Sequence, residues 1–157
     1  CKKSKFISLN AQSNASNIGY HSIQKYKNID CVVMNENELR HELRNKSDKI
    51  NLLTKQLSQI NNIKNLIITK GLEGAILYNS KKNKFYTCPA FASNVVDKVG
   101  AGDTMLSIIS LLLNQKFESI ISLFLSSIAA AFTVEEVSNK VPISKIKLLK
   151  YLNHITK

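Results

Sequence analysis

The sequence predicts an α/β fold built around a mostly parallel central sheet. Short apolar runs, typical of strands buried on both faces, alternate with longer segments that have helical periodicity. The last third of the chain carries helical patterns, which supply cover for a sheet. With 157 residues, of which 44% are hydrophobic, the chain is long enough for one domain with its own core.

The expected elements follow from apolar runs, caps and turn residues. Residues 30–34 and 66–69 are short and apolar, as buried parallel strands are. Asn35 directly follows the first of these runs and is a natural N-cap for the next helix. A polar turn closes a hairpin, and Pro142 separates the last two helices. In chain order we expect a strand at residues 5–9, a polar loop at 10–17, a helix at 18–26, a strand at 30–34, helices at 35–45 and 51–60, strands at 66–69, 75–78 and 84–88, and helices at 102–113, 118–134 and 144–154.

Composition and charge exclude several classes of protein. The net charge is +11, but the 22 Lys and Arg residues are spread along the chain without a nucleic-acid-binding motif, so we expect a solvated basic surface. Three widely spaced cysteines and three isolated histidines offer neither a disulfide framework nor a zinc site. The longest uncharged run, at 119–134, is short for a membrane span. We therefore expect a cytoplasmic protein that contacts neither nucleic acid nor membrane.

A glycine-rich turn, Asp-Lys-Val-Gly-Ala-Gly-Asp at residues 97–103, runs directly into an expected helix. Because no side chain at 100–102 is larger than a methyl group, the backbone can approach a ligand closely, and a helix N-terminus favours an anion. Asp103 would lie beside that anion with a carboxylate able to accept a proton. This arrangement suits phosphoryl transfer to a hydroxyl. The turn matches neither the Walker A nor the dinucleotide pattern, and glycines used only for packing are the alternative.

Two other polar stretches follow expected buried strands. Ligands of open α/β sheets bind beyond the carboxyl ends of strands, where Asn35 with Glu38 and the loop from Thr69 to Gly74 are expected. Glu38 could orient the water shell of Mg²⁺, or could only stabilise a helix N-terminus. Gly71 and Gly74 could let the backbone pass close to a ligand, or could only permit a hairpin turn.

The three motifs, in this order, resemble those of the ribokinase-like (PfkB) carbohydrate kinases. The resemblance implies a ribokinase-like three-layer sandwich, of which residues 1–157 would be the carboxyl-terminal part of one kinase domain, without its amino-terminal half and lid. The chain also opens on Cys1, shortly before an expected internal strand, so we expect a piece of a longer protein. The implied activity is transfer of the γ-phosphoryl of ATP to a hydroxyl of a sugar or sugar phosphate. ATP and Mg²⁺ are the implied cofactors, and a monovalent cation stays open.

The resemblance also implies roles for the glycine-rich turn. In the family the second Asp of this signature is the catalytic base, which here is Asp103. The backbone amides of the Gly-Ala-Gly stretch form the anion hole, here Gly100, Ala101 and Gly102. The family often has Thr or a small residue where Lys98 stands. That lysine could contact phosphate or point into solvent, so its role stays open.

The other two motifs imply nucleotide contacts. The family's Asn-x-x-Glu motif, here Asn35 and Glu38, organises magnesium and phosphate mostly through water, so Glu38 would reach the metal through water. The Thr-x-Gly-x-x-Gly loop, here Thr69, Gly71 and Gly74, lines the nucleotide phosphates and ribose.

Several alternatives stay open at this point. The chain could come from a vitamin or nucleoside kinase of the same fold, or could be a non-catalytic nucleotide-binding domain. Asp103 argues against the last, because such a domain has no need of a base there. Residues 9–19 resemble sugar-kinase domains found with nucleotidylyltransferases, as in heptose-phosphate kinases, so a fused or partner nucleotidylyltransferase and a homodimer are further expectations. Which sugar is used cannot be predicted, because the residues that choose it are expected in the missing half.

Overall fold

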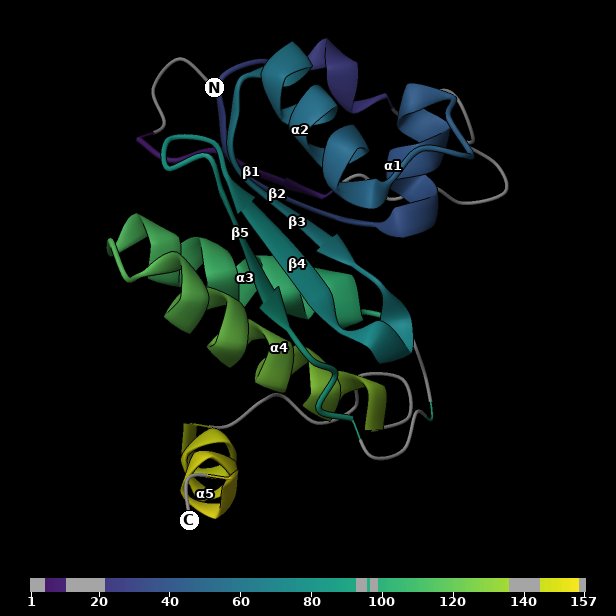
Figure 1. Cartoon of the computed structure of the whole chain (residues 1–157). Helices are drawn as coiled ribbons and strands as arrows, with labels where there is room; N and C mark the ends of the chain where they lie inside the picture. The colour runs from purple at the N-terminus through teal and green to yellow at the C-terminus, as the bar shows by residue number, and fades with distance from the viewer. Residues whose placement is uncertain (1–4, 11–21, 93–95, 97–98, 136–144, 156–157) are drawn as a thin grey trace.

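A five-stranded sheet forms the centre of the computed structural model, which describes residues 5–10, 22–92, 96, 99–135 and 145–155 (Figure 1). The strands lie in the order of the chain, with β1, β2 and β3 parallel and with β4 and β5 antiparallel to their neighbours. The expected α/β architecture, including its hairpin, is therefore confirmed. The strands are β1 (Ser8–Asn10), β2 (Ile29–Asn35), β3 (Ile63–Thr69), β4 (Ala75–Asn79) and β5 (Lys84–Cys88).

Helices cover both faces of the sheet. In Figure 1, α1 and α2 lie on one face, and α3 and α4 lie on the other. Of the six helices expected from the sequence, the second to the sixth start and end within two residues of the observed ones. The helices are α1 (Glu36–Leu43), α2 (Ile50–Asn61), α3 (Ala101–Asn114), α4 (Ser119–Glu135) and α5 (Lys145–Ile155), with short 3₁₀ turns η1 (Ile23–Lys25) and η2 (Gly71–Glu73).

The burial of strand β2 on both faces explains why its sequence is continuously apolar. Val32 and Met34 pack in the core on the side of α1 and α2, whereas Cys31 and Val33 pack in the core on the side of α3 and α4. A strand covered on both faces has no polar side. Burial raises the pKa of the Cys31 thiol to about 12, so this side chain stays a neutral part of the core.

Two expected elements differ from the structure. The described part of the helix expected at 18–26 is only the single turn η1, and residues 18–21 lie outside the described part of the chain. The reason is tertiary, because the Asn61 side-chain amide donates hydrogen bonds to the carbonyls of Ile23 (2.9 Å) and Tyr26 (2.7 Å). The first strand starts later than expected because the Asp30 carboxylate accepts the N–H of Ile7, and the strand then extends to Asn10.

Tyr151 of helix α5 contacts the rest of the molecule. The Tyr151 ring packs edge-on against Phe132 of α4, with 5.0 Å between ring centroids, and its hydroxyl donates to the Phe91 carbonyl at 3.2 Å. This contact ties the last helix to the segment that follows β5. Within the described ranges, no helix combines the length and the hydropathy needed to cross a bilayer.

Candidate active site

Each of the three parallel strands ends on a polar residue. Asn10 ends β1, Asn35 ends β2 and Thr69 ends β3. Asn35 is directly opposite Thr69 in the register of the sheet, and Asn10 is opposite Val33. Because the strands are parallel, these residues meet at one edge, where open α/β sheets bind their ligands.

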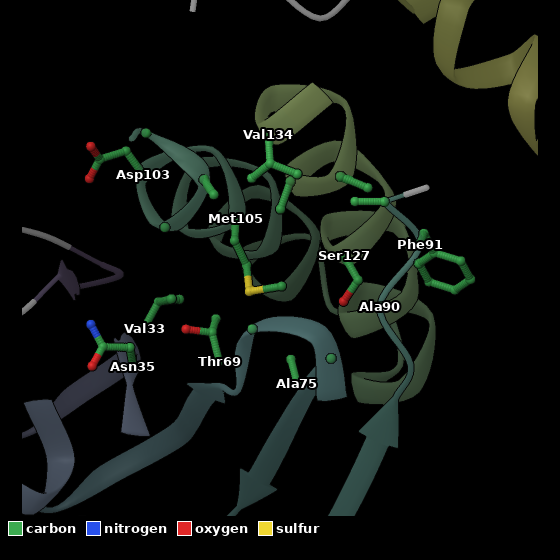
Figure 2. Close-up of a pocket in the computed structure, with 18 of the residues that line it drawn as sticks. Val33, Asn35, Thr69, Ala75, Ala90, Phe91, Asp103, Met105, Ser127 and Val134 are labelled. Carbon is green, nitrogen blue, oxygen red and sulfur yellow. The ribbon is translucent and has the colours of Figure 1, made fainter. Parts of the chain in front are cut away.

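A cavity of about 450 Å³ lies at this edge, within the range of ligand-binding pockets. Figure 2 shows Asp103, at the start of α3, across the cavity from Asn35 and Thr69, with Ser127 and Val134 on the α4 side. The fold brings together all the site residues expected from the sequence, although they come from three separate stretches of the chain. The expected residues that line the cavity are Asn35, Glu38, Thr69, Gly71, Gly74, Gly100, Ala101, Gly102 and Asp103.

The N-terminus of α3 opens into the cavity without a side-chain cap. Gly100 is the N-cap residue, with φ 84°, and its carbonyl accepts the first helical hydrogen bond from the N–H of Thr104 at 2.9 Å. The first-turn N–H groups have no partners inside a helix, and the macrodipole favours an anion there. A methyl group added at Gly102 would make only an ordinary contact, 3.7 Å from Asn10 Nδ2. Packing in the described structure therefore does not require glycine at this position.

Asp103 lies in the first turn of α3 and is exposed. Its Oδ1 accepts a hydrogen bond from the side-chain amide of Asn10, with 2.8 Å between Nδ2 and Oδ1. Sequence analysis missed Asn10 as a site residue, because it reads as the start of the polar loop expected at 10–17. The available signal was its position directly after an apolar run, which it shares with Asn35.

Asn35 and Glu38 form a capping box at the start of α1. Asn35 Oδ1 accepts the N–H of Glu38 at 2.8 Å, and Glu38 Oε2 accepts the N–H of Asn35 at 2.7 Å. The capping alternative raised by the sequence is thus present in the structure. A carboxylate has room for about four hydrogen bonds, so capping does not prevent Glu38 from also orienting water around a metal ion.

The two glycines of the loop after β3 differ in what their surroundings require. Gly71 has φ 58° and faces open space, since a methyl group there would meet nothing within 4 Å. Gly74 has φ 85°, and a methyl group there would overlap the carbonyl oxygen of Cys88 and the backbone after it. Close packing against the end of β5 accounts for Gly74, whereas Gly71 borders the cavity.

The far wall of the cavity is apolar. Met105 of α3 and small residues of α4 line it, together with Phe91 after β5. The α4 residues that line the cavity are Ser127, Ala130, Ala131 and Val134.

The described lining residues carry negative charge alone. Glu38 and Asp103 are the charged ones among them, and none is basic; Lys98 lies outside the described part of the chain. A polyphosphate would therefore need to bring a cation with it. In the described ranges no group of three or more His, Cys, Asp or Glu side chains could hold a metal ion. Mg²⁺ usually keeps several waters and binds one or two carboxylates together with substrate phosphates.

Comparison with protein families gives one match over most of the chain. The family model described as pfkB family carbohydrate kinase matches residues 3–146. Among curated proteins, no match was found.

The fold also matches solved structures of kinases. The chain is similar to ribokinase from Thermotoga maritima, with a TM-score of 0.79, 17% identity, and coverage of 97% of this chain and 50% of that one. It is similar to phosphofructokinase-2 from Escherichia coli in complex with potassium, with a TM-score of 0.77, 15% identity, and coverage of 97% and 48%. Ribokinase from Arabidopsis thaliana, complexed with ribose and ATP, matches with a TM-score of 0.67 and 22% identity over 79% of this chain and 41% of that one. At these identities the likeness shows the fold, and the chain spans about half the length of the first two proteins.

Proposed function

The chain belongs to the pfkB family of carbohydrate kinases, and on that premise we propose that its cavity is the nucleotide and catalytic-base side of a sugar kinase. The proposed reaction transfers the γ-phosphoryl of ATP to a hydroxyl of a sugar or sugar phosphate. The observation that carries the proposal is the placement of Asp103 in the same cavity as the uncapped N-terminus of α3. A base and an anion-binding helix start are the two parts that this transfer needs from the protein.

Asp103 would act as the general base. Its carboxylate would accept the proton of the acceptor hydroxyl as the oxygen attacks, and the backbone N–H groups at Gly100, Ala101 and Gly102 would stabilise negative charge on the transferred group. Mg²⁺ bound with the nucleotide would neutralise phosphate charge. Donors fixed in a helix need no rearrangement during the reaction, which is why they stabilise a transition state well.

The Asn35 and Glu38 pair would hold the hydrated metal ion and the phosphates. The acidic lining supports this proposal, because a polyphosphate without its cation would be repelled by Glu38 and Asp103. Thr69 and Gly71 would line the phosphates and ribose, and the apolar wall offers a face for the base of the nucleotide.

The acceptor side is proposed to lie in protein outside these 157 residues. The chain covers about half of the solved kinases it resembles. A homodimer, a fused or partner nucleotidylyltransferase and a cytoplasmic location are kept as proposals. The potassium complex of the Escherichia coli enzyme supports testing a monovalent cation.

The test is a kinase assay on the full-length protein with MgATP and a panel of sugars, sugar phosphates, nucleosides and vitamins. Asp103→Asn should lower kcat by roughly 10² to 10⁴-fold, the usual worth of general base catalysis, while MgATP affinity measured by calorimetry changes little. Glu118→Gln, at an exposed site outside the cavity, is the matched control. An Asp103→Asn variant with wild-type turnover would remove Asp103 from the mechanism. MgATP binding without turnover on any acceptor would favour the non-catalytic alternative.

A further inference from the structure

Asn10 is a polar residue of the cavity to which the proposed function gives no role. It ends β1, lines the cavity and hydrogen-bonds to Asp103, 93 residues further along the chain. We propose that Asn10 is a positioning residue, whose side-chain amide fixes the Asp103 carboxylate so that its second oxygen is presented to the acceptor hydroxyl. This inference rests on the proposed function.

The geometry explains why such a residue is needed. Asp103 is an exposed side chain in the first turn of a helix, where several rotamers are ordinarily accessible. A bond of 2.8 Å from a strand end holds one of its oxygens in place. Among the described residues, Asn10 is the one whose side chain reaches this carboxylate. A displacement of the base by about 1 Å can lower the rate on the order of 10²-fold, so fixing the rotamer of Asp103 has a large effect on turnover.

The chemistry of the amide suits this task. Among the described residues, the Asn10 Nδ2 group donates to Oδ1 of Asp103, which leaves the lone pairs of Oδ2 to accept a proton. The amide is neutral, so it orients the carboxylate without adding a charge next to the phosphoryl site. A lysine or arginine in its place would instead form an ion pair with the base and favour its charged form strongly.

The support for Asn10 is rigid. Ser8, Leu9 and Asn10 pair in parallel register with Cys31, Val32 and Val33 of β2, which lies inside the core. Asn10 Nδ2 also lies beside the first turn of α3, as its distance of 3.7 Å from a methyl group added at Gly102 shows. Strand β1 therefore places the amide against both the base and the anion-binding turn.

The experiment is a double-mutant cycle in the full-length protein, with kcat, the KM for MgATP and thermal stability measured for each variant. Asn10→Ala removes the amide, and Asn10→Asp keeps its shape while removing the donor. Asn114→Ala, at the opposite end of α3, is the control because it is exposed and outside the cavity. We expect kcat to fall about 10 to 100-fold in both Asn10 variants, with an unchanged KM for MgATP. Asn10→Ala combined with Asp103→Asn should be no slower than Asp103→Asn alone, because one residue acts through the other.

The outcomes separate this inference from the proposed function. If the wild type turns over and Asp103→Asn does not, but Asn10→Asp keeps wild-type kcat, the positioning role is wrong and the proposed function stands. Losses that multiply in the double variant would likewise overturn it, since Asn10 would then act independently of Asp103. A wild type without acceptor-dependent turnover, or an active Asp103→Asn variant, would overturn both.

Discussion

At the scale of single residues, the glycines of the cavity are explained by different causes. Gly102 distinguishes most clearly between a glycine required for packing and a glycine required for ligand binding, because its neighbours leave room for a methyl group. Gly102→Ala should leave the melting temperature unchanged or raise it, since alanine in a helix is up to about 1 kcal/mol more favourable than glycine. We expect kcat to fall on the order of 10²-fold, as when one anion-stabilising donor is lost, because the methyl group would occupy the anion site. Thermal melts and steady-state kinetics, with Asn114→Ala as control, check both parts; full activity would show that no ligand approaches Gly102.

Glu38 caps helix α1 in the structure, and in the proposed function it also holds the hydrated metal ion. One substitution separates the two roles. Glu38→Gln keeps an oxygen that can accept the N–H of Asn35, so it preserves the capping box but removes the charge. We expect the Mg²⁺ requirement for turnover to rise, with a stability change of only a few tenths of a kcal/mol. Glu38→Ala removes both functions and should also lose stability. A magnesium titration of Glu38→Gln that overlays the wild type would leave Glu38 with a capping role alone.

At the scale of elements, the loop from β3 to β4 combines a structural glycine with a cavity glycine. Gly74→Ala should destabilise the protein by about 3 kcal/mol or more, because a side chain there is strained and overlaps the backbone at the end of β5. Gly71→Ala should cost only about 1 to 2 kcal/mol, the penalty of a left-handed residue in open space. Denaturant unfolding measures both. The prediction fails if the two variants are equally stable.

The loop from β3 to β4 should also affect the affinity for MgATP. Gly71 borders the cavity, so Gly71→Ala should weaken MgATP binding in calorimetry even though the protein stays folded. An unchanged affinity would assign the Thr-x-Gly-x-x-Gly stretch to the turn alone.

At the scale of the whole molecule, the sequence was sufficient where local pattern decides the structure. The apolar runs of β2 and β3 predicted buried strands, and the polar residues after them predicted the edge where the cavity lies. Prediction from the sequence failed where a hydrogen bond from a side chain far along the chain determines the local structure. The Asn61 side-chain amide donates to the carbonyls of Ile23 and Tyr26 around the single turn η1, and Asp30 takes the N–H of Ile7. Asn10 was missed because its partner, Asp103, is 93 residues away, and only its position after an apolar run pointed to the site.

The proposed function also predicts how residues 1–157 behave when they are expressed alone. Within the described sheet, β1 pairs only with β2, so its other edge presents unpaired backbone groups, a feature that favours aggregation. We expect residues 1–157 expressed alone to be poorly soluble, to bind MgATP weakly, and to release no ADP in response to sugars, because the acceptor is not aligned. Calorimetry and an ADP assay on the soluble fraction test this. Sugar-dependent ADP release would place a complete acceptor pocket within these residues.

The bond between Asn10 and Asp103 also has a consequence for the order in which the protein is made and folds. A ribosome completes β1 long before it completes α3, and contacts between distant parts of a chain form late because closing a long loop costs entropy. The capping box and the loop after β3 are local and can form early. A nascent or partly unfolded chain would then form the parts of the proposed nucleotide site that are local in sequence before Asn10 can reach Asp103.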